Sequence, residues 1–387
     1  MGDGPAVFVV AGEASGDMHG AGLVRAMRRR RPDTSFSGIG GSMMKEAGVS
    51  LIFPNSDLAV VGLVEIVSHA ASIVRAFKKT VRWLADNRPS LLILIDYPEF
   101  NMLLAARAVK LGIPVMYFIS PQIWAWRQGR VHKLKKLVDR MVVILPFEEE
   151  FYSRFGMKVD FVGHPLVDTV RAETDRDAFC SALGLDTGRP LVSLLPGSRG
   201  GEIERLLPLL RDAADIVHKA EPDVQFVLPV APGLGPESLS MLEGAVADLQ
   251  SSGVCVQIVA GMTWDAINAS DMAVAASGTV TLEAAILGTP SVVVYRLAPL
   301  SYHIGRLLVR VRYASLVNLV ADREILPELI QNDATPVRLA RVVRELLADR
   351  ERYGKLVRDM SGAVGKLGPP GALDRAAEIA CGFLKAG

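Results

Sequence analysis

Short runs of apolar residues alternate along this chain with longer segments in which apolar and polar residues follow a helical period. In the first half, apolar runs of strand length occupy residues 7–11, 91–95, 115–119 and 141–145. In the second half, they occupy residues 191–195, 225–230, 254–259, 272–276 and 291–295. Strands that are apolar throughout and alternate with amphipathic helices are typical of parallel sheets covered on both faces. The pattern therefore predicts an α/β protein with two doubly wound, Rossmann-like domains.

The boundary between the two predicted domains falls near Gly163-His164-Pro165, where the first series of strands ends. We expect a first domain over residues 1–165 and a second over residues 166–345. The helices expected in residues 346–387 would pack back across the junction. No basic residues precede the apolar run that begins at Ala6, so we interpret that run as the first strand and not as a signal peptide.

Composition narrows the class of protein. Of the 387 residues, 43 are Lys or Arg and 42 are Asp or Glu, so no overall field would hold the chain on nucleic acid. The three cysteines lie far apart without metal-ligand spacing, which speaks against disulfides and structural zinc and favours the cytoplasm. The long apolar window over residues 58–77 contains Glu65, His69 and Arg75, so we expect no transmembrane span. A mean hydropathy of +0.29 leaves room for contact with a membrane surface.

Ligands of open parallel sheets bind beyond the carboxyl ends of the strands, so the residues after each apolar run are candidates for chemistry. The first such segment, residues 12–19, has closely spaced glycines that permit close approach of a ligand. Its polar side chains belong to Glu13, Ser15, Asp17 and His19. The alternative is a turn in which Ser15 or Asp17 caps the following helix, and this motif alone favours capping.

Asp96 follows the apolar run at residues 91–95 and is a second candidate. A carboxylate at that edge could accept a proton from a substrate hydroxyl. The spacing of Asp96 and Glu99, with Pro98 between them, is equally typical of a helix cap. Both interpretations stay open at this point.

Two further turns, both in the second half, have the composition of phosphate sites. Gly197, Ser198 and Arg199 precede a predicted helix, whose N-terminus and guanidinium would attract a diphosphate. The segment lacks GxxxxGKS or GxxxxGKT, so a magnesium P-loop is not expected, and the alternative is a mobile loop with a solvated arginine. In the second turn, Ser277, Gly278 and Thr279 could hold a phosphate, and Glu283 could accept hydrogen bonds from ribose hydroxyls. The alternative is that Thr279 only caps the following helix. We expect that helix to end at Gly288. Two such turns in one half favour a nucleoside diphosphate.

Two basic segments are candidate interaction surfaces. In the helix expected over residues 63–84, the residues predicted to be buried are Leu63, Ile66, Val67, Ala70, Val74, Phe77, Val81 and Leu84. Another face of that helix presents residues suited to a lipid headgroup layer, namely Arg75, Lys79, Arg82 and Trp83. The second segment, residues 124–140, includes Trp126 and Arg127 and favours an anionic ligand or interface over a merely solvated helix.

A set of motifs stands in a fixed order over nearly the whole chain. They are residues 10–17 (VAGEASGD), Ile95-Asp96 with Pro98 and Phe100-Asn101, Ser120-Pro121 with residues 124–127 (WAWR), residues 145–148 (LPFE), Gly163-His164, residues 194–200 (LLPGSRG), residues 276–279 (ASGT) with Leu282-Glu283, and Tyr313, Ser315-Leu316, Asn318-Leu319 and Arg323-Glu324. In this order they resemble the lipid-A-disaccharide synthase family. The resemblance implies a GT-B fold with two Rossmann-like domains facing a cleft.

The resemblance also implies an activity. It is the transfer of 2,3-diacylglucosamine from its UDP derivative to the 6-hydroxyl of 2,3-diacylglucosamine 1-phosphate, giving a β-1,6 disaccharide and UDP. The anomeric centre is inverted, and neither a metal ion nor another cofactor takes part. The expected location is the cytoplasmic face of the inner membrane, with peripheral attachment, and a homodimer is kept open.

Site residues follow from the same resemblance. Positions important for catalysis are Asp96, Arg199 and Asn318. Residues expected to bind UDP are Gly197, Ser198, Arg199, Gly261, Ser277, Gly278, Thr279 and Glu283. Residues expected to bind the acceptor are Glu13, Ser15, Asp17, His19, Trp126 and Arg127. Two other classes stay open: a different UDP-sugar GT-B enzyme, either a transferase or a 2-epimerase, and a non-catalytic nucleotide-binding membrane adaptor.

Overall fold

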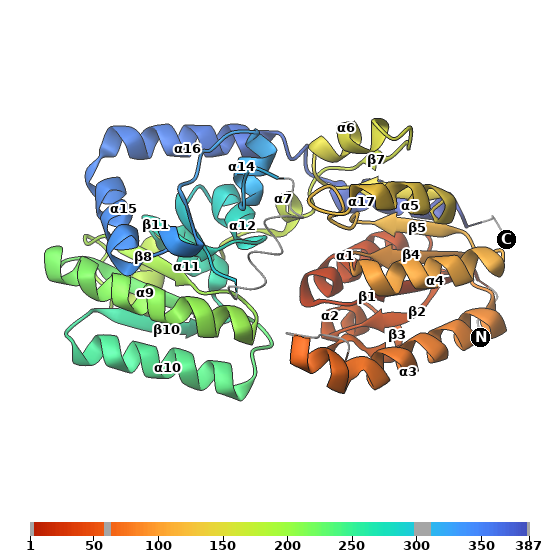
Figure 1. Ribbon diagram of the computed structural model, residues 1–387, viewed down its shortest axis with the longest axis horizontal. Coiled ribbons are helices and arrows are strands. Elements are labelled where there is room, and N and C mark those ends of the chain that lie inside the picture. Colours follow the sequence, from red (N-terminus) through yellow and green to blue (C-terminus); the bar gives the residue numbers. More distant parts are fainter. Residues whose placement is uncertain (1–3, 58–62, 298–310, 385–387) are drawn as a thin grey trace. The chain divides into compact units, whose positions relative to one another are not determined.

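The computed structural model describes residues 4–57, 63–297 and 311–384. It divides into two compact units, which are Met1–Asp168 together with Leu367–Gly387, and Thr169–Lys366. Each unit is built on a parallel sheet with helices on both faces (Figure 1), which confirms the predicted α/β class.

The sheet of the first unit has seven strands in the order β3-β2-β1-β4-β5-β6-β7. Their bounds are β1 (Ala6–Ala11), β2 (Ser35–Gly40), β3 (Ser50–Pro54), β4 (Leu91–Ile95), β5 (Val115–Phe118), β6 (Arg140–Val143) and β7 (Asp160–Phe161). Strand β1 pairs with both β2 and β4, so the strand order reverses between β1 and β4. Such a switch point is where ligands of open parallel sheets bind.

Helices cover both faces of this sheet. They are α1 (Ala14–Arg30), α2 (Ser42–Glu46), α3 (Leu63–Asn87), α4 (Pro98–Lys110), α5 (Val131–Leu137), α6 (Phe147–Ser153) and α17 (Ala372–Cys381), and a short α7 (Leu166–Thr169) ends the first run of the unit. Helix α17 comes from the far end of the sequence and packs on α1. Its small residues Ala376, Ala377 and Ala380 are fully buried there, which allows the two helices to approach closely.

The second unit repeats the plan with six strands in the order β10-β9-β8-β11-β12-β13. The strands are β8 (Leu191–Leu195), β9 (Gln225–Val230), β10 (Val256–Ala260), β11 (Met272–Ala276), β12 (Ser291–Tyr295) and β13 (Glu328–Ile330). The helices are α8 (Arg176–Leu183), α9 (Gly200–Ala220), α10 (Pro236–Ser251), α11 (Thr263–Ala269), α12 (Val280–Ile286), α14 (Leu316–Ala321), α15 (Pro336–Ala348) and α16 (Arg350–Gly365). The strand order reverses between β8 and β11, which marks the switch point of this sheet.

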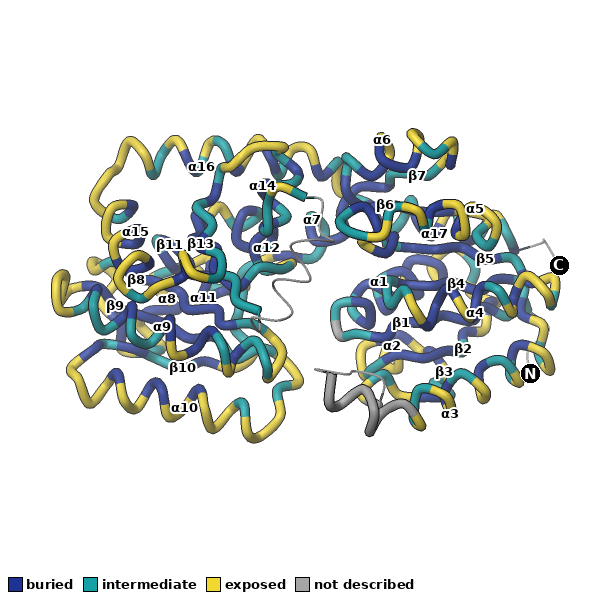
Figure 2. Tube along the Cα trace, viewed as in Figure 1, coloured by how far each residue is buried: buried dark blue, intermediate teal, exposed yellow. Residues whose placement is uncertain are grey.

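The central strands form the cores of the two units, as the burial map shows (Figure 2). Every residue of β4 is fully buried, which explains why that strand was recognisable as a continuous apolar run. Strands β2, β3, β7 and β13 were not predicted, because they are short or rich in serine and glycine. In β2, a Cβ at Gly38 would lie 2.0 Å from the Val9 carbonyl oxygen, so close packing on β1 excludes any side chain there.

The C-terminal region divides differently from the prediction. Residues 346–366, which contain the end of α15 and all of α16, belong to the second unit, and residues 367–387 belong to the first. Two hydrogen bonds help to hold this last segment in the first unit. The Asp168 carboxylate accepts them from the backbone N–H groups of Gly371 and Ala372, at 2.6 and 3.0 Å. No helix in the described part of the chain is long and apolar enough to cross a membrane.

Candidate active site

The switch point of the first unit brings two of the predicted motifs together. Ala11 at the end of β1 is paired with Ile95 at the end of β4, so the segments that begin at Gly12 and Asp96 emerge side by side. A Cβ at Gly12 would lie 2.4 Å from the Tyr97 ring, so only glycine lets that ring lie against the turn. Burial raises the pKa of the Tyr97 phenol, and the charge of Glu13 adds to the shift. Glu13 and the Asp96 segment therefore share one edge.

Asp96 is not the helix cap that its spacing allowed. Helix α4 begins at Pro98, and the N-cap residue is Tyr97, whose side chain makes no capping hydrogen bond. Both Asp96 and Tyr97 have left-handed backbone angles, with φ of 42° and 44°. Non-glycine residues rarely adopt such angles, and they concentrate at functional sites. Asp96 thus lies one residue before the N-cap of α4, in a left-handed turn at the sheet edge, and its catalytic role stays a prediction.

Two arginines tie the segment after β5 to the first turn of α4. Arg127 and Arg130 both bind the Glu99 carboxylate, at 2.9 and 2.7 Å. The Arg127 guanidinium also lies 4.2 Å from the centre of the Trp126 ring. Trp126 and Arg127 thus lie on a segment joined to the helix that follows Asp96. This segment is not the start of a long helix, since α5 covers only Val131–Leu137.

A buried network anchors the beginning of that segment and was missed from the sequence. The Ser120 hydroxyl is 2.8 Å from Oε1 of Glu148 and 2.8 Å from the Tyr152 hydroxyl. Glu148 is 1% exposed and also accepts a hydrogen bond from the Leu145 N–H at 2.9 Å. Burial raises the pKa of the Glu148 carboxyl to about 7. Glu148 belongs to one of the family motifs, but its composition resembles that of its exposed neighbours Glu149 and Glu150, so the sequence did not show that it is buried.

Two residues predicted to bind the acceptor are buried in the structure. The Asp17 carboxylate is 5% exposed and accepts hydrogen bonds from the N–H groups of Gly41, Met43 and Met44 at 2.7 to 3.1 Å. It therefore caps α2 and neither caps α1 nor faces a ligand. His19 is also 5% exposed, with its ring 6.3 Å from that of His164, and burial lowers its pKa to about 4. Ser15, in the first turn of α1, is only partly buried.

In the second unit, the loop after β8 has the geometry of an anion site. Gly197 has φ of 118°, and Arg199 is the N-cap residue of α9. The loop already surrounds a carboxylate: Glu202 lies 3.2 Å from the Ser198 N–H nitrogen and 3.4 Å from the Arg199 guanidinium. Backbone N–H groups and a guanidinium facing one carboxylate are the donors that a phosphate requires.

The turn after β11 lies beside that loop, because Ala275 of β11 is paired with Leu195 of β8. Its Ser277 hydroxyl donates to the Ala314 carbonyl at 2.7 Å, which gives it a structural partner. Glu283 accepts a hydrogen bond from the Trp264 indole at 2.9 Å, and burial raises the pKa of its carboxyl. Trp264 was not predicted, because nothing in its local sequence points to Glu283.

The glycines around this turn fit a close approach of ligand. Among the described residues, no atom lies within 4 Å of a Cβ placed on Gly278 or on Gly261. Gly261, after β10, has φ of 74°. Thr279 is the N-cap residue of α12 and makes no side-chain capping bond. Gly288 has φ of 82° directly after the C-cap residue of α12, which confirms its predicted role in ending that helix.

Asn318 does not present its amide to a ligand. The side chain is fully buried, and Nδ2 donates to the Leu326 carbonyl at 2.9 Å and to Glu328 at 2.8 Å. Its Oδ1 accepts from the N–H groups of Ile325 and Leu326. Glu328 in turn accepts from the N–H groups of residues 314 and 315, the segment that holds the Ser277 hydroxyl. Asn318 therefore braces the segment behind Ser277, and its catalytic role stays a prediction.

The predicted membrane face of α3 needs two corrections. Arg75, Lys79 and Arg82 are exposed, but the Trp83 ring packs on Phe8 of β1 with the ring centres 4.7 Å apart. Conversely, Val74 was expected to be buried and is 51% exposed. The side chains of Leu63, Ile66, Val67 and Ala70 lie outside the described residues. The helix is rotated from the prediction, because Ala76, Thr80 and Leu84 form its buried side.

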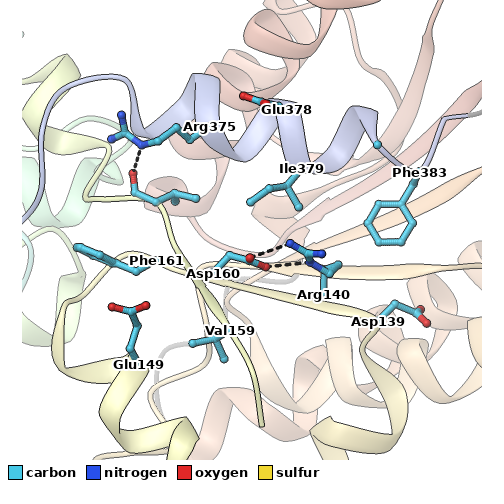
Figure 3. A pocket seen from close by; sticks show the side chains of 12 residues that line it. Asp139, Arg140, Glu149, Val159, Asp160, Phe161, Arg375, Glu378, Ile379 and Phe383 are labelled. Atoms are coloured by element: carbon cyan, nitrogen blue, oxygen red, sulfur yellow. Dashed lines mark hydrogen bonds and ion pairs between the residues drawn. The ribbon is translucent and has the colours of Figure 1, made fainter.

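A pocket of about 840 Å³ lies elsewhere in the first unit, between β7 and α17. Figure 3 shows the ion pair between Arg140 and Asp160 in its wall, with a separation of 2.7 Å. Arg375 donates to the Val162 carbonyl at 2.9 Å. The residues predicted for catalysis or ligand binding are not among those that line this pocket. Within the described residues, no group of three or more His, Cys, Asp or Glu side chains could hold a metal ion.

Comparisons with known proteins show one family that this chain matches over nearly its whole length. A family model described as lipid-A-disaccharide synthetase matches residues 7–380. The lipid-A-disaccharide synthase of Syntrophus aciditrophicus is 47% identical over 379 residues, which cover 98% of each chain. That of Geobacter sulfurreducens is 45% identical over 379 residues, covering 98% of this chain and 97% of the relative.

Solved structures with the same fold are much more distant in sequence. The UDP-GlcNAc 2-epimerase from Neisseria meningitidis, bound to UDP-GlcNAc, aligns with a TM-score of 0.67 at 12% identity, covering 97% of this chain and all (100%) of that one. Anabaena HepE in complex with UDP and glucose aligns with a TM-score of 0.58 at 10% identity, covering 98% and 99%. This likeness shows the two-domain α/β architecture known as GT-B.

Proposed function

Because the chain belongs to the lipid-A-disaccharide synthase family, it is a glycosyltransferase that forms the lipid A disaccharide, and we propose how its two sheet edges share the reaction. The donor is UDP-2,3-diacylglucosamine and the acceptor is 2,3-diacylglucosamine 1-phosphate. The acceptor 6-hydroxyl displaces UDP from the anomeric carbon with inversion, giving a β-1,6 linkage. The first unit binds the acceptor, and the second binds the UDP sugar.

Asp96 is the proposed general base. The observation that carries this assignment is the position of Asp96: it follows a fully buried strand at the switch point of the sheet and has a left-handed backbone there, with φ of 42°. As the hydroxyl attacks, its proton needs an acceptor, and a carboxylate fixed at the sheet edge provides one. Glu13 lies on the same edge of the sheet. Arg127 binds Glu99 in the first turn of the helix that follows Asp96, and Trp126 stacks on Arg127. These groups surround the acceptor sugar and its phosphate in the proposal.

Arg199 and the amides of its loop are the proposed partners of the diphosphate. UDP leaves as an anion, so its developing charge must be stabilised by fixed donors. The Ser198 N–H and the Arg199 guanidinium already face one carboxylate, which supports this assignment. Glu283, oriented by Trp264, is placed to accept hydrogen bonds from ribose hydroxyls. Gly261 and Gly278 would leave room for the nucleotide, and Gly197 and Thr279 are proposed to contact it. If no metal ion takes part, turnover should be unchanged in EDTA.

Replacement of Asp96 by Asn tests the proposal. We expect turnover to fall by about 100-fold or more, since general base catalysis is worth that much, while UDP affinity is unchanged. The measurement is the rate of UDP release from the donor in the presence of acceptor. Asp86→Asn, at an exposed carboxylate of α3, is the matched control. A folded Asp96→Asn enzyme with full turnover would contradict the assignment.

Attachment to a membrane surface is also proposed, because both lipid substrates carry acyl chains. Arg75, Lys79 and Arg82 form an exposed basic strip on α3 that would attract anionic headgroups, whereas Trp83 is excluded from it by its packing on Phe8. Flotation with anionic vesicles should weaken when these three charges are reversed, and unchanged flotation would remove the strip from the proposal. The inner-membrane location and a homodimer remain predictions. The epimerase and adaptor alternatives are not favoured, because the family match spans residues 7–380.

A further inference from the structure

The backbone around Asp96 is strained in a way that needs support from its surroundings. Asp96 and Tyr97 are two consecutive non-glycine residues with left-handed φ, and Ile119 at the end of the neighbouring strand β5 has φ of 64°. A β-branched residue at such an angle is a marked outlier. The Asp96 N–H donates to the Ile119 carbonyl at 3.3 Å, so the strained segments are linked. Strain of this kind persists only where neighbouring groups fix it.

Two buried side chains bind the strained turn through its main chain. The Asn101 amide nitrogen donates to the carbonyl oxygens of Ile95 and Asp96, at 3.1 and 2.7 Å. The Tyr117 hydroxyl donates to the same Asp96 carbonyl at 2.5 Å. Asn101 and Tyr117 are both fully buried, so these hydrogen bonds do not exchange with water. Between them, the two side chains supply donors that fix the orientation of the Asp96 peptide group.

The two donors come from different elements, which makes the support specific to the fold. Asn101 lies in the first turns of α4, and Tyr117 lies in β5, next to β4 in the sheet. Without them, the partly buried Asp96 carbonyl would lose both of these donors, and the turn would relax toward ordinary backbone angles. The Asp96 carboxylate would then leave the position that faces the acceptor, since its direction depends on φ and ψ of its own residue.

We infer that Asn101 and Tyr117 are positioning residues for the glycosyl transfer, which hold the left-handed Asp96-Tyr97 turn so that the Asp96 carboxylate points at the acceptor hydroxyl. This inference rests on the proposed role of Asp96. Neither residue touches substrate. Their contribution is to turnover and not to substrate binding, because the rest of the acceptor and nucleotide contacts do not involve the Asp96 peptide.

The test uses Tyr117→Phe in the full-length enzyme, because it removes one donor and keeps the packing. We expect kcat to fall about tenfold with KM for both substrates unchanged within about twofold, which corresponds to one buried hydrogen bond. Asn101→Ala, which removes two hydrogen bonds, should lower kcat further. Tyr353→Phe is the matched control, since the Tyr353 hydroxyl donates to another aspartate main-chain carbonyl, that of Asp271, at 2.8 Å in the second unit.

A double-mutant cycle with Asp96→Asn separates positioning from general stability. If Tyr117 acts through Asp96, Tyr117→Phe has no further effect on kcat once Asp96 is Asn. An equal loss in both backgrounds, or wild-type kcat in a folded Tyr117→Phe enzyme, would overturn the inference. Full activity of Asp96→Asn alone would overturn the proposed base, and with it the reason for positioning Asp96. Should Asn101→Ala not fold, the Tyr117→Phe arm still decides.

Discussion

At the scale of single residues, burial changes what the side chains of this protein do. Glu148 is one of three consecutive glutamates, yet it alone is buried, with the Ser120 hydroxyl and the Leu145 N–H as donors. Desolvation disfavours the charged carboxylate, which raises its pKa to about 7. In the unfolded chain the same carboxyl would titrate at its ordinary value near 4.5. The difference links folding to pH.

Glu148→Gln should make the free energy of unfolding less dependent on pH. Between about pH 4.5 and 7 the folded protein retains a proton that the unfolded chain releases, so the free energy of unfolding falls as pH rises through this window. The loss amounts to about 3 kcal/mol for one carboxyl. Thermal unfolding across this range should therefore show a smaller decrease for Glu148→Gln than for wild type. Glu150→Gln, at an exposed neighbour, should leave the slope unchanged, and parallel Glu148→Gln and wild-type curves would contradict the shift.

At the scale of elements, the N-terminus of α9 holds an internal anion. Glu202 lies 3.2 Å from the Ser198 N–H nitrogen and 3.4 Å from Arg199, the groups assigned to the diphosphate. A Cβ at Gly197 would lie 2.5 Å from the Glu202 carboxylate, so the loop closes tightly on it. A bound diphosphate must compete with this carboxylate for the same donors.

Glu202→Gln should therefore bind UDP more tightly. A partly exposed ion pair is worth less than about 1 kcal/mol, so we expect about a threefold decrease in Kd by calorimetry. Arg199→Ala should have the opposite effect, because it removes the guanidinium itself. Glu204→Gln, at an exposed position of the same helix, is the control. Weaker binding by Glu202→Gln would show that Glu202 supports the loop and does not compete with the ligand.

The orientation of α3 shows what an element's sequence leaves open. Its apolar residues fit more than one stripe, and the one that included Val74 was wrong, because Val74 is 51% exposed. Contact with β1 decided the orientation: Trp83 packs on Phe8, and Ala76, Thr80 and Leu84 face the core. A tryptophan that sequence placed beside cations on the surface is thus part of the packing.

At the scale of the whole molecule, the first unit depends on the end of the chain. Helix α17 packs on α1, where Leu373 reaches Gly22 so closely that a Cβ there would lie 2.6 Å from it. Arg29 binds Asp374 at 3.0 Å, and Arg30 donates to the Asp374 carbonyl. The arginines at the end of α1 are therefore partly engaged with α17 and do not merely face solvent.

Removal of residues 367–387 should consequently destabilise the first unit alone. The deleted segment buries two leucines and several alanines, so the loss is of the order of 5 kcal/mol. We expect a fragment of residues 1–168 to unfold at a lower temperature or to aggregate, and the fragment 169–366 to unfold cooperatively by itself. Adding a peptide of residues 367–387 to the first fragment should restore its melting temperature. A fragment 1–168 as stable as the same unit in the whole protein would contradict this dependence.

Features of this protein that depend on neighbours along the chain could be predicted from the amino-acid sequence alone. Continuous apolar runs located the central strands, β4 and β8 to the residue, and the residues after them, such as Asp96 and Arg199, proved to lie at the two switch points. The ordered motifs were enough to indicate the family. These features are local because a few consecutive residues are enough to indicate a buried strand or the composition of a turn.

Which polar side chains have partners within the protein depends instead on contacts between distant parts of the chain. Asp17 caps α2, Asn318 braces residues 325–328, and Ser277 bonds to Ala314, although each stands in a motif typical of binding. Asn101 and Tyr117 stood out less in the sequence, yet both donate hydrogen bonds to the Asp96 carbonyl, which is not adjacent to either residue in the sequence. The physical reason is that the role of a buried polar side chain depends on the partner that binds it. The fold brings that partner from a distant part of the chain.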